Sequence, residues 1–222
     1  MISLSLIRAC IFFVLSFFLP NRARVILLSL LYLKRLPSSL TIAPCFIDVD
    51  VLQLHGENRI GFLTIFRNLK LLHLEIGARI GTFNWIYGSR SIWADELEST
   101  LRMKRGSSVT SRHIIDCMGG VEIGEFSLIA GYRSQIISHG INLKQCQQEF
   151  ERVVVGRYCF IGTNVVILKG SNLSDYSVIS AGSVFKDRVS TPYSFYSGIP
   201  ATRQAGLPEY FEFFKRSSSH IN

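Results

Sequence analysis

Apolar residues recur at every sixth position over a long stretch of this chain, residues 155–188. Six units open with an aliphatic or aromatic residue, at positions 155, 161, 167, 173, 179 and 185, and in the first five a small residue stands four positions later: Cys159, Val165, Ser171, Ser177 and Ser183. A period of six matches neither the ~3.6 residues of a helical turn nor the ~2 of an ordinary strand, and it is typical of a parallel β-helix. The pattern predicts coils of three units, with Val155 stacked on Leu173 and Ile161 on Ile179 inside the solenoid.

Weaker hexads extend this pattern towards the N-terminus. Leu74, Ile80, Ile86 and Ile92 lie six positions apart, and the units return in residues 123–134. The period is broken by mixed charges at about 95–106 and by a polar stretch at 140–152. We therefore expect the coils to begin near residue 45 and two loops to project from them at these breaks.

The hexads stop after Arg188, and three prolines then punctuate a tail whose aromatic run at 210–214 predicts a short helix. The expected fold class is an all-β solenoid, a β-helix with N-terminal apolar helices and a short C-terminal helix. The predicted organisation is a helical segment at 1–36, a β-helix domain at 37–190 and a C-terminal tail at 191–222.

Two apolar runs at residues 2–19 and 25–33 precede the repeats, separated by Pro20 and Asn21. The chain carries a net charge of +8, and no acidic residue precedes Asp48, whereas five basic residues lie in the first 36 positions. Apolar helices with basic ends are typical of the cytoplasmic face of a membrane. We expect residues 1–36 to be a peripheral or monotopic membrane-associating segment; helices that cover the end of the β-helix or a subunit interface remain an alternative.

This uneven charge argues against a nucleic-acid-binding protein, whose basic residues are expected to cover one folded face. A secretory signal peptide is disfavoured because no small-x-small cleavage site follows the first apolar run. The five cysteines lack CxxC spacing and are odd in number, so we expect reduced thiols in a cytoplasmic protein and no metal site.

Residues 107–203 resemble the hexapeptide-repeat acyltransferases, which include polysaccharide O-acetyltransferases. The resemblance rests on SRHIID at 111–116, GGVEIG at 119–124, SLIAG at 127–131, SHG at 138–140, the full array, and SGIPAT at 197–202. It implies a left-handed β-helix, a homotrimer and acetyl-CoA as co-substrate. Periodicity alone fixes neither the hand nor the oligomeric state.

His139 stands where these enzymes carry their catalytic histidine, whose neutral imidazole takes a proton from the acceptor hydroxyl. The resemblance places an acceptor-contacting polar residue at His113, on the coil below, and Arg112 and Asp116 share that stretch as acceptor-binding candidates. Ser138, beside His139, is a further candidate for the acceptor site and is expected either to brace the histidine or to be only a corner residue. His113 has the alternative of stacking structurally, and either Arg112 or Asp116 is expected to orient a sugar hydroxyl or a histidine.

The resemblance also assigns the donor side. Thr163, Ala181 and Gly182 match positions that contact the pantetheine arm, while Lys186 and Arg203 match basic positions that bind the nucleotide phosphates. Two departures weaken the phosphate assignment: Phe185 stands where the family often has Thr, and the basic residue after the proline is displaced to Arg203.

The sequence therefore predicts an acetyl-CoA-dependent O-acetyltransferase that modifies a sugar hydroxyl of a surface polysaccharide or of its lipid-linked precursor, by direct transfer with His139 as general base. Two alternatives remain open. One is a soluble acetyltransferase for an amino sugar or xenobiotic, and the other is a β-helix that serves only as a scaffold.

Overall fold

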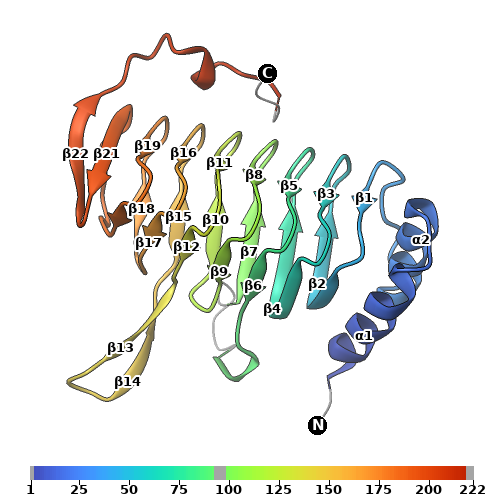
Figure 1. The fold of residues 1–222 in the computed structure, drawn as a ribbon. Helices are drawn as coiled ribbons and strands as arrows, with labels where there is room; N and C mark the ends of the chain where they lie inside the picture. Colours follow the sequence, from blue (N-terminus) through green and yellow to red (C-terminus); the bar gives the residue numbers. More distant parts are fainter. Residues whose placement is uncertain (1–2, 93–98, 219–222) are drawn as a thin grey trace.

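The protein is a solenoid of short parallel strands with two helices at its N-terminal end and a segment that folds back from its C-terminal end (Figure 1). The structure, a computed structural model, describes residues 3–92 and 99–218. The strands stack in three columns, which we call faces A, B and C. Each coil runs from face C to face A to face B, which confirms the parallel β-helix predicted from the hexads.

Face A contains the strands of one column, in stacking order: β1 (Thr41–Ile42), β3 (Arg59–Ile60), β5 (Arg79–Ile80), β8 (Ser108–Val109), β11 (Leu128–Ile129), β16 (Phe160–Ile161), β19 (Val178–Ile179) and β21 (Ser194–Gly198). Face B contains β6 (Trp85–Tyr87), β9 (Ile114–Asp116), β12 (Gln135–Ile136), β17 (Val166–Ile167) and β20 (Val184–Phe185). Face C contains β7 (Thr100–Met103), β10 (Val121–Ile123), β15 (Val153–Val155) and β18 (Asn172–Leu173). Two long strands, β2 (Phe46–Leu54) and β4 (Ile65–Leu74), run across both face B and face C at the N-terminal end.

The hexad aliphatics form the core, as the pattern predicts. Val155 pairs with Leu173, Ile161 with Ile179 and Ile167 with Phe185, and all six side chains are buried. The small residues at the fifth position are buried as well. Burying an aliphatic side chain of this size contributes about 1.5–3 kcal/mol, so the stacked columns supply much of the stability of the solenoid.

Two boundaries differ from the expectation. The prediction of a loop at about 95–106 is wrong for the second half of that range. There β7 pairs with β4 and β10, and it buries Leu101 and Met103. The charged residues Arg102 and Lys104 alternate with these two and obscure them in the sequence. Residues 93–98 of that predicted loop lie outside the described part of the chain.

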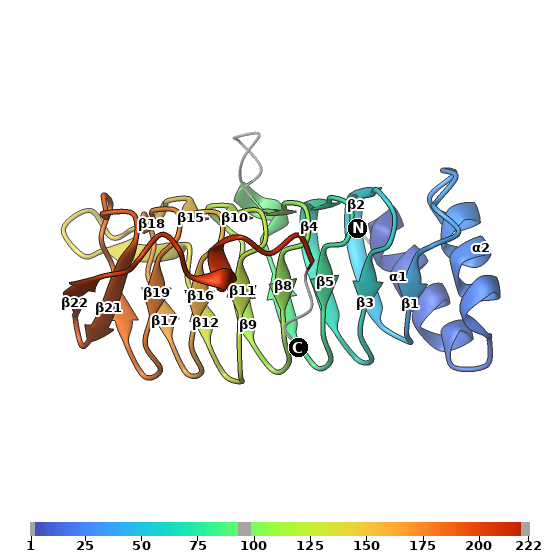
Figure 2. The same cartoon turned by 90° about the horizontal axis from the view of Figure 1, so that it is seen from above.

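The repeat also continues beyond residue 190. β21 adds a further parallel strand to face A, and β22 (Ala201–Gly206) then pairs with it in the antiparallel direction. The aromatic run contains a short 3-10 helix, η2 (Glu212–Phe214). Figure 2 shows this C-terminal segment passing back across the solenoid from β22 towards β8.

The two N-terminal helices, α1 (Leu4–Ser16) and α2 (Asn21–Leu31), lie against the first coil (Figure 1). Phe12, Val25 and Leu28 join the solenoid core, and the Asn21 side chain binds the backbone of Leu40 and Ile42. The helices therefore cap the open end of the β-helix. In the described residues no helix is long and apolar enough to cross a membrane.

Candidate active site

A histidine and an aspartate meet at the edge between faces B and C. Asp116 ends β9, and His139 follows β12 and begins the hairpin of β13 (His139–Asn142) and β14 (Gln147–Phe150). Because β9 and β12 are paired in register, the residues that follow them come together at this edge. The hairpin projects from the solenoid here, as predicted for 140–152 (Figure 1).

Asp116 fixes the orientation of His139. The Asp116 carboxylate is fully buried and accepts a hydrogen bond from the imidazole Nδ1. It also accepts from the backbone N–H groups of Ser138 at 3.1 Å, His139 at 3.2 Å and Met118 at 2.8 Å. With the proton on Nδ1, the other ring nitrogen, Nε2, is a free acceptor, and the His139 side chain is 30% exposed. No hydrogen bond to Nε2 occurs among residues 3–92 and 99–218, so the arrangement is suited to general-base chemistry.

Ser138 holds the two coils together behind this pair. Its hydroxyl donates to the Asp116 carbonyl at 2.7 Å and accepts from the Gly119 N–H at 2.9 Å, and the residue is buried. A Cβ on Gly119 would lie 2.6 Å from the Ser138 carbonyl oxygen, so only glycine fits. Burial of both Ser138 and Asp116 removes them from direct contact with an acceptor, and their contacts are with His139 and the backbone.

His113 lies inside the coil, which differs from its expected place in an acceptor site. The residue is 1% exposed, Nδ1 accepts from the Ser134 N–H at 3.1 Å, and Nε2 is 2.8 Å from the Thr110 hydroxyl. Burial lowers the pKa of His113 from its ordinary 6.5 to about 4. The structure thus gives it the stacking role that the sequence left as an alternative.

Arg112 lies at another edge, between faces A and B, where its guanidinium rests near the rings of Phe83 (5.7 Å) and Tyr132 (6.0 Å). The expected donor residues share this edge. The Thr163 hydroxyl donates to the Tyr132 carbonyl at 2.9 Å, and the Gly182 N–H donates to the Thr163 carbonyl at 3.0 Å. Gly182 has a φ of +72° and open space around it, and Thr163 and Ala181 are exposed. Within one protomer, face B separates this edge from His139.

Lys186 and Arg203 are brought together by the structure, although the sequence separates them by 17 positions. Both line a pocket of about 350 Å³ at the C-terminal end, together with Ser190, Thr191 and Thr202. Arg203 donates from Nε to the Ser194 hydroxyl at 2.8 Å. Two cations with neighbouring hydroxyl groups are suited to phosphate groups.

Two neighbours of the His139 edge were not foreseen. Lys169 forms ion pairs with Glu149 and Glu151, and Arg188 pairs with Glu151 at 2.5 Å, which fixes the base of the hairpin. Tyr87 is paired with Asp116 across β6 and β9, and burial followed by the Asp116 charge raises its pKa. Lys169 lies within the regular hexads and Tyr87 within the weaker hexads, so neither stands out in the sequence. Only the register between coils brings them to the His139 edge.

Among the described residues, no group of three or more His, Cys, Asp or Glu side chains is arranged to hold a metal ion. All five cysteines are free, and Cys45, Cys117 and Cys159 are buried. Burial raises the pKa of Cys159 to about 12, which makes it an unreactive packing residue.

Comparison with known proteins points to acetyltransferases. The chain is 27% identical over 139 residues to the Bacillus subtilis (strain 168) protein named "Putative acetyltransferase YvoF", covering 60% of this chain and 73% of that one. The solved polysialic acid O-acetyltransferase OatWY aligns with a TM-score of 0.51 at 16% identity, covering 78% of this chain and 81% of that one. A hexapeptide-repeat acetyltransferase from Vibrio cholerae, solved with acetyl coenzyme A, aligns with a TM-score of 0.43 at 16% identity, covering 92% and 87%. No protein-family model matches the chain. The resemblance to hexapeptide-repeat acetyltransferases expected from the sequence is confirmed.

Proposed function

We propose that this chain, which resembles the hexapeptide-repeat acetyltransferases, is an acetyl-CoA-dependent O-acetyltransferase with His139 as its general base. The observation that carries the proposal is the buried Asp116 carboxylate that holds the His139 ring and leaves Nε2 accessible. Sequence likeness to an acetyltransferase supports the reaction class. The acceptor is a sugar hydroxyl of a surface polysaccharide or of its lipid-linked precursor.

The proposed reaction uses the geometry of the His139–Asp116 pair. Nε2 of His139 takes the proton of the acceptor hydroxyl while that oxygen attacks the thioester carbonyl of acetyl-CoA. The carbon–sulfur bond breaks, and the imidazolium returns the proton to the coenzyme A thiolate. Asp116 stabilises the imidazolium that forms between these steps, as the buried aspartate does in the Ser-His-Asp triad.

The donor is proposed to lie against Thr163, Ala181 and Gly182, with its phosphates at Lys186 and Arg203. Because the edge between faces A and B is separated from His139 within one protomer, the site is complete only where two protomers meet. This separation of the two edges supports the homotrimer that the resemblance implies, and left-handed coils are part of the same proposal.

Replacing His139 by Ala tests the mechanism. Acetyl transfer from radiolabelled acetyl-CoA to a saccharide-precursor fraction should fall by about 10²–10⁴-fold, while acetyl-CoA binding by calorimetry stays unchanged. His55→Ala is a matched control, because His55 is exposed and distant in the fold from this edge. Full turnover in His139→Ala would refute the mechanism.

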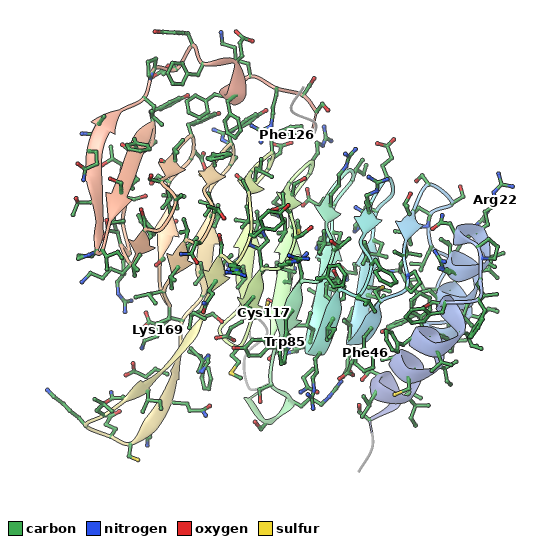
Figure 3. All side chains as sticks on the ribbon, in the orientation of Figure 1. Arg22, Phe46, Trp85, Cys117, Phe126 and Lys169 are labelled. Carbon is green, nitrogen blue, oxygen red and sulfur yellow. The ribbon has the colours of Figure 1, made fainter. Side chains whose placement is uncertain are left out.

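We also propose that the outer faces of α1 and α2 bind the cytoplasmic surface of a membrane. The two helices and the turns that follow them expose apolar side chains, among them Phe18 (83%) after α1, Leu30 (66%) in α2 and Leu33 (87%) after α2. Arg22 points away from the solenoid on the same end of the molecule (Figure 3), and Lys34 and Arg35 are exposed nearby. Exposed apolar helix faces flanked by cations match an anionic lipid surface.

Deleting residues 1–36 would uncover the core, so substitution is the better test. The triple variant Phe18→Glu, Leu30→Glu, Leu33→Glu should lose sedimentation with phosphatidylglycerol vesicles while keeping the wild-type circular dichroism spectrum. Leu143→Glu, at an exposed position in the hairpin, is the control. Unchanged sedimentation of the triple variant would refute the anchor.

A further inference from the structure

A groove with a mainly apolar lining lies between α1 and face B. It has a volume of about 670 Å³ and is lined by Phe13, Phe46, Ile65, Phe83 and Trp85, with Arg67 as the one charged residue among those described. Trp85 is 51% exposed and Phe83 46% exposed. Large apolar side chains that stay exposed in contiguous groups mark binding surfaces.

The groove continues towards the candidate active site as a row on face B. Strand pairing aligns Phe46 with Ile65, Ile65 with Trp85, and Trp85 with Ile114, and Ile114 is also exposed. Figure 3 shows Phe46 beside the helices and Trp85 further along the solenoid, near Cys117. Ile114 lies on the same strand as Asp116, the partner of His139. The row therefore links the proposed membrane-binding helices with the His139 edge.

A second row on the same face carries the charge. Arg67 is aligned with Tyr87, and Tyr87 with Asp116. Because neighbouring strands are about 4.8 Å apart, the backbones at Arg67 and Asp116, two strands apart, are separated by about 10 Å across the strands. The Arg67 side chain is exposed, and no ion pair or hydrogen bond of its guanidinium is recorded within residues 3–92 and 99–218. An unpaired cation beside an apolar groove complements an anionic head group attached to a hydrocarbon chain.

We propose that the groove binds the hydrocarbon chain and phosphate of a lipid-linked saccharide, the acceptor of the reaction proposed above. The phosphate lies at Arg67, the chain passes between Ile65, Trp85 and Phe13 towards the membrane, and the sugar extends past Tyr87 to His139. The inference rests on the proposed function for the identity of the acceptor, but the binding site is testable without it.

Binding of farnesyl phosphate tests the groove directly. The sequence contains two tryptophans, so a Trp93→Phe background leaves Trp85 as the only fluorescent indole. Farnesyl phosphate should change the fluorescence of Trp85 and bind at least about tenfold more tightly than uncharged farnesol, because a phosphate–guanidinium contact is charge-assisted. Arg67→Ala should remove this preference and leave farnesol binding unchanged. Arg59→Ala, an exposed arginine on face A, is the matched control.

Three results would overturn the inference. The first is equal affinity of wild type and Arg67→Ala for farnesyl phosphate, or no response of Trp85. The second is equally good competition by inorganic phosphate or by phosphatidylglycerol, which would indicate a general anion site or a contact with bulk lipid. The third is a pair of findings: the wild-type protein does not bind farnesyl phosphate, and the Phe83→Glu variant dissociates from an oligomer. Together they would make the groove an interface between copies of this chain.

The His139→Ala variant separates this inference from the proposed function. It should bind farnesyl phosphate like wild type, because His139 lies beyond the phosphate position. Arg67→Ala should lose its preference for farnesyl phosphate but still transfer acetyl groups to a lipid-free saccharide. This result would support both the lipid-binding groove and the proposed reaction. Transfer to lipid-linked saccharide that is unaffected by Arg67→Ala would refute the groove and leave the reaction standing.

Discussion

The edge at His139 and the coil interior at His113 place two histidines of neighbouring coils in opposite environments. His139 has one nitrogen held by a buried carboxylate and the other accessible, whereas His113 has both nitrogens satisfied inside the solenoid. In this chain the histidine proposed as the base lies where the strand turns outwards, and the histidine inside the coil has no nitrogen left for an acceptor. The position within the coil, more than the residue type, decides the role.

Asp116→Asn is expected to have the largest effect on this contrast. An amide cannot stabilise the imidazolium or enforce the Nδ1-protonated tautomer, so the turnover number should fall by about 10²–10⁴-fold with little change in acetyl-CoA affinity. Steady-state kinetics at saturating acetyl-CoA measures this. Asp175→Asn, which alters an exposed ion pair with Arg157 at the edge between faces C and A, is the control. A wild-type turnover number for Asp116→Asn would mean that His139 acts without its partner.

His113→Ala should reduce stability without altering the KM for the acceptor. Removing a buried side chain leaves a cavity and deprives the Ser134 N–H of its acceptor, which together cost about 2–4 kcal/mol. Urea unfolding followed by circular dichroism gives the loss. An acceptor KM that rises severalfold in the folded variant would restore His113 to the acceptor site.

The pH dependence of stability tests the burial of His113. The pKa of His113 is lowered to about 4 in the folded state from 6.5. The unfolded state therefore binds more protons between these values, and His113 makes the free energy of unfolding fall as the pH falls from about 6.5 to about 4. His113→Gln should flatten this part of the profile measured by urea unfolding. A slope that is identical in the variant would assign the effect to other groups.

Gly119→Ala is expected to lower the turnover number less than Asp116→Asn does, and its effect begins at the edge beside His139. The added methyl group meets the Ser138 carbonyl and the Glu151 N–H, so the backbone beside His139 must shift. We expect a turnover number lowered at least about tenfold together with a clear loss of stability, because both close contacts are with backbone atoms. A crystal structure or amide exchange at 138–151 shows whether the shift is local.

The hexads predict the solenoid well because an inward aliphatic every six residues leaves few other ways to bury the chain. The pairs Val155–Leu173 and Ile161–Ile179 follow directly from the spacing. The same spacing fails at 100–103, where Leu101 and Met103 stand among charged residues that point outwards. Likewise, motif likeness singles out His139 but cannot tell that His113 points inwards.

Along the chain, the hexad period determined the coil architecture, and its break at 140–152 marked the segment that projects. The two N-terminal helices were predicted from apolar runs with basic ends. Only the tertiary structure decided which residues meet, because contacts at an edge depend on the register between coils whose paired positions are 17 to 32 residues apart. That register joins Asp116 to His139, Lys186 to Arg203 in one pocket, and Arg67 to the row that leads to the same edge. The sequence supplies these residue types, and the stacking of the coils turns them into sites.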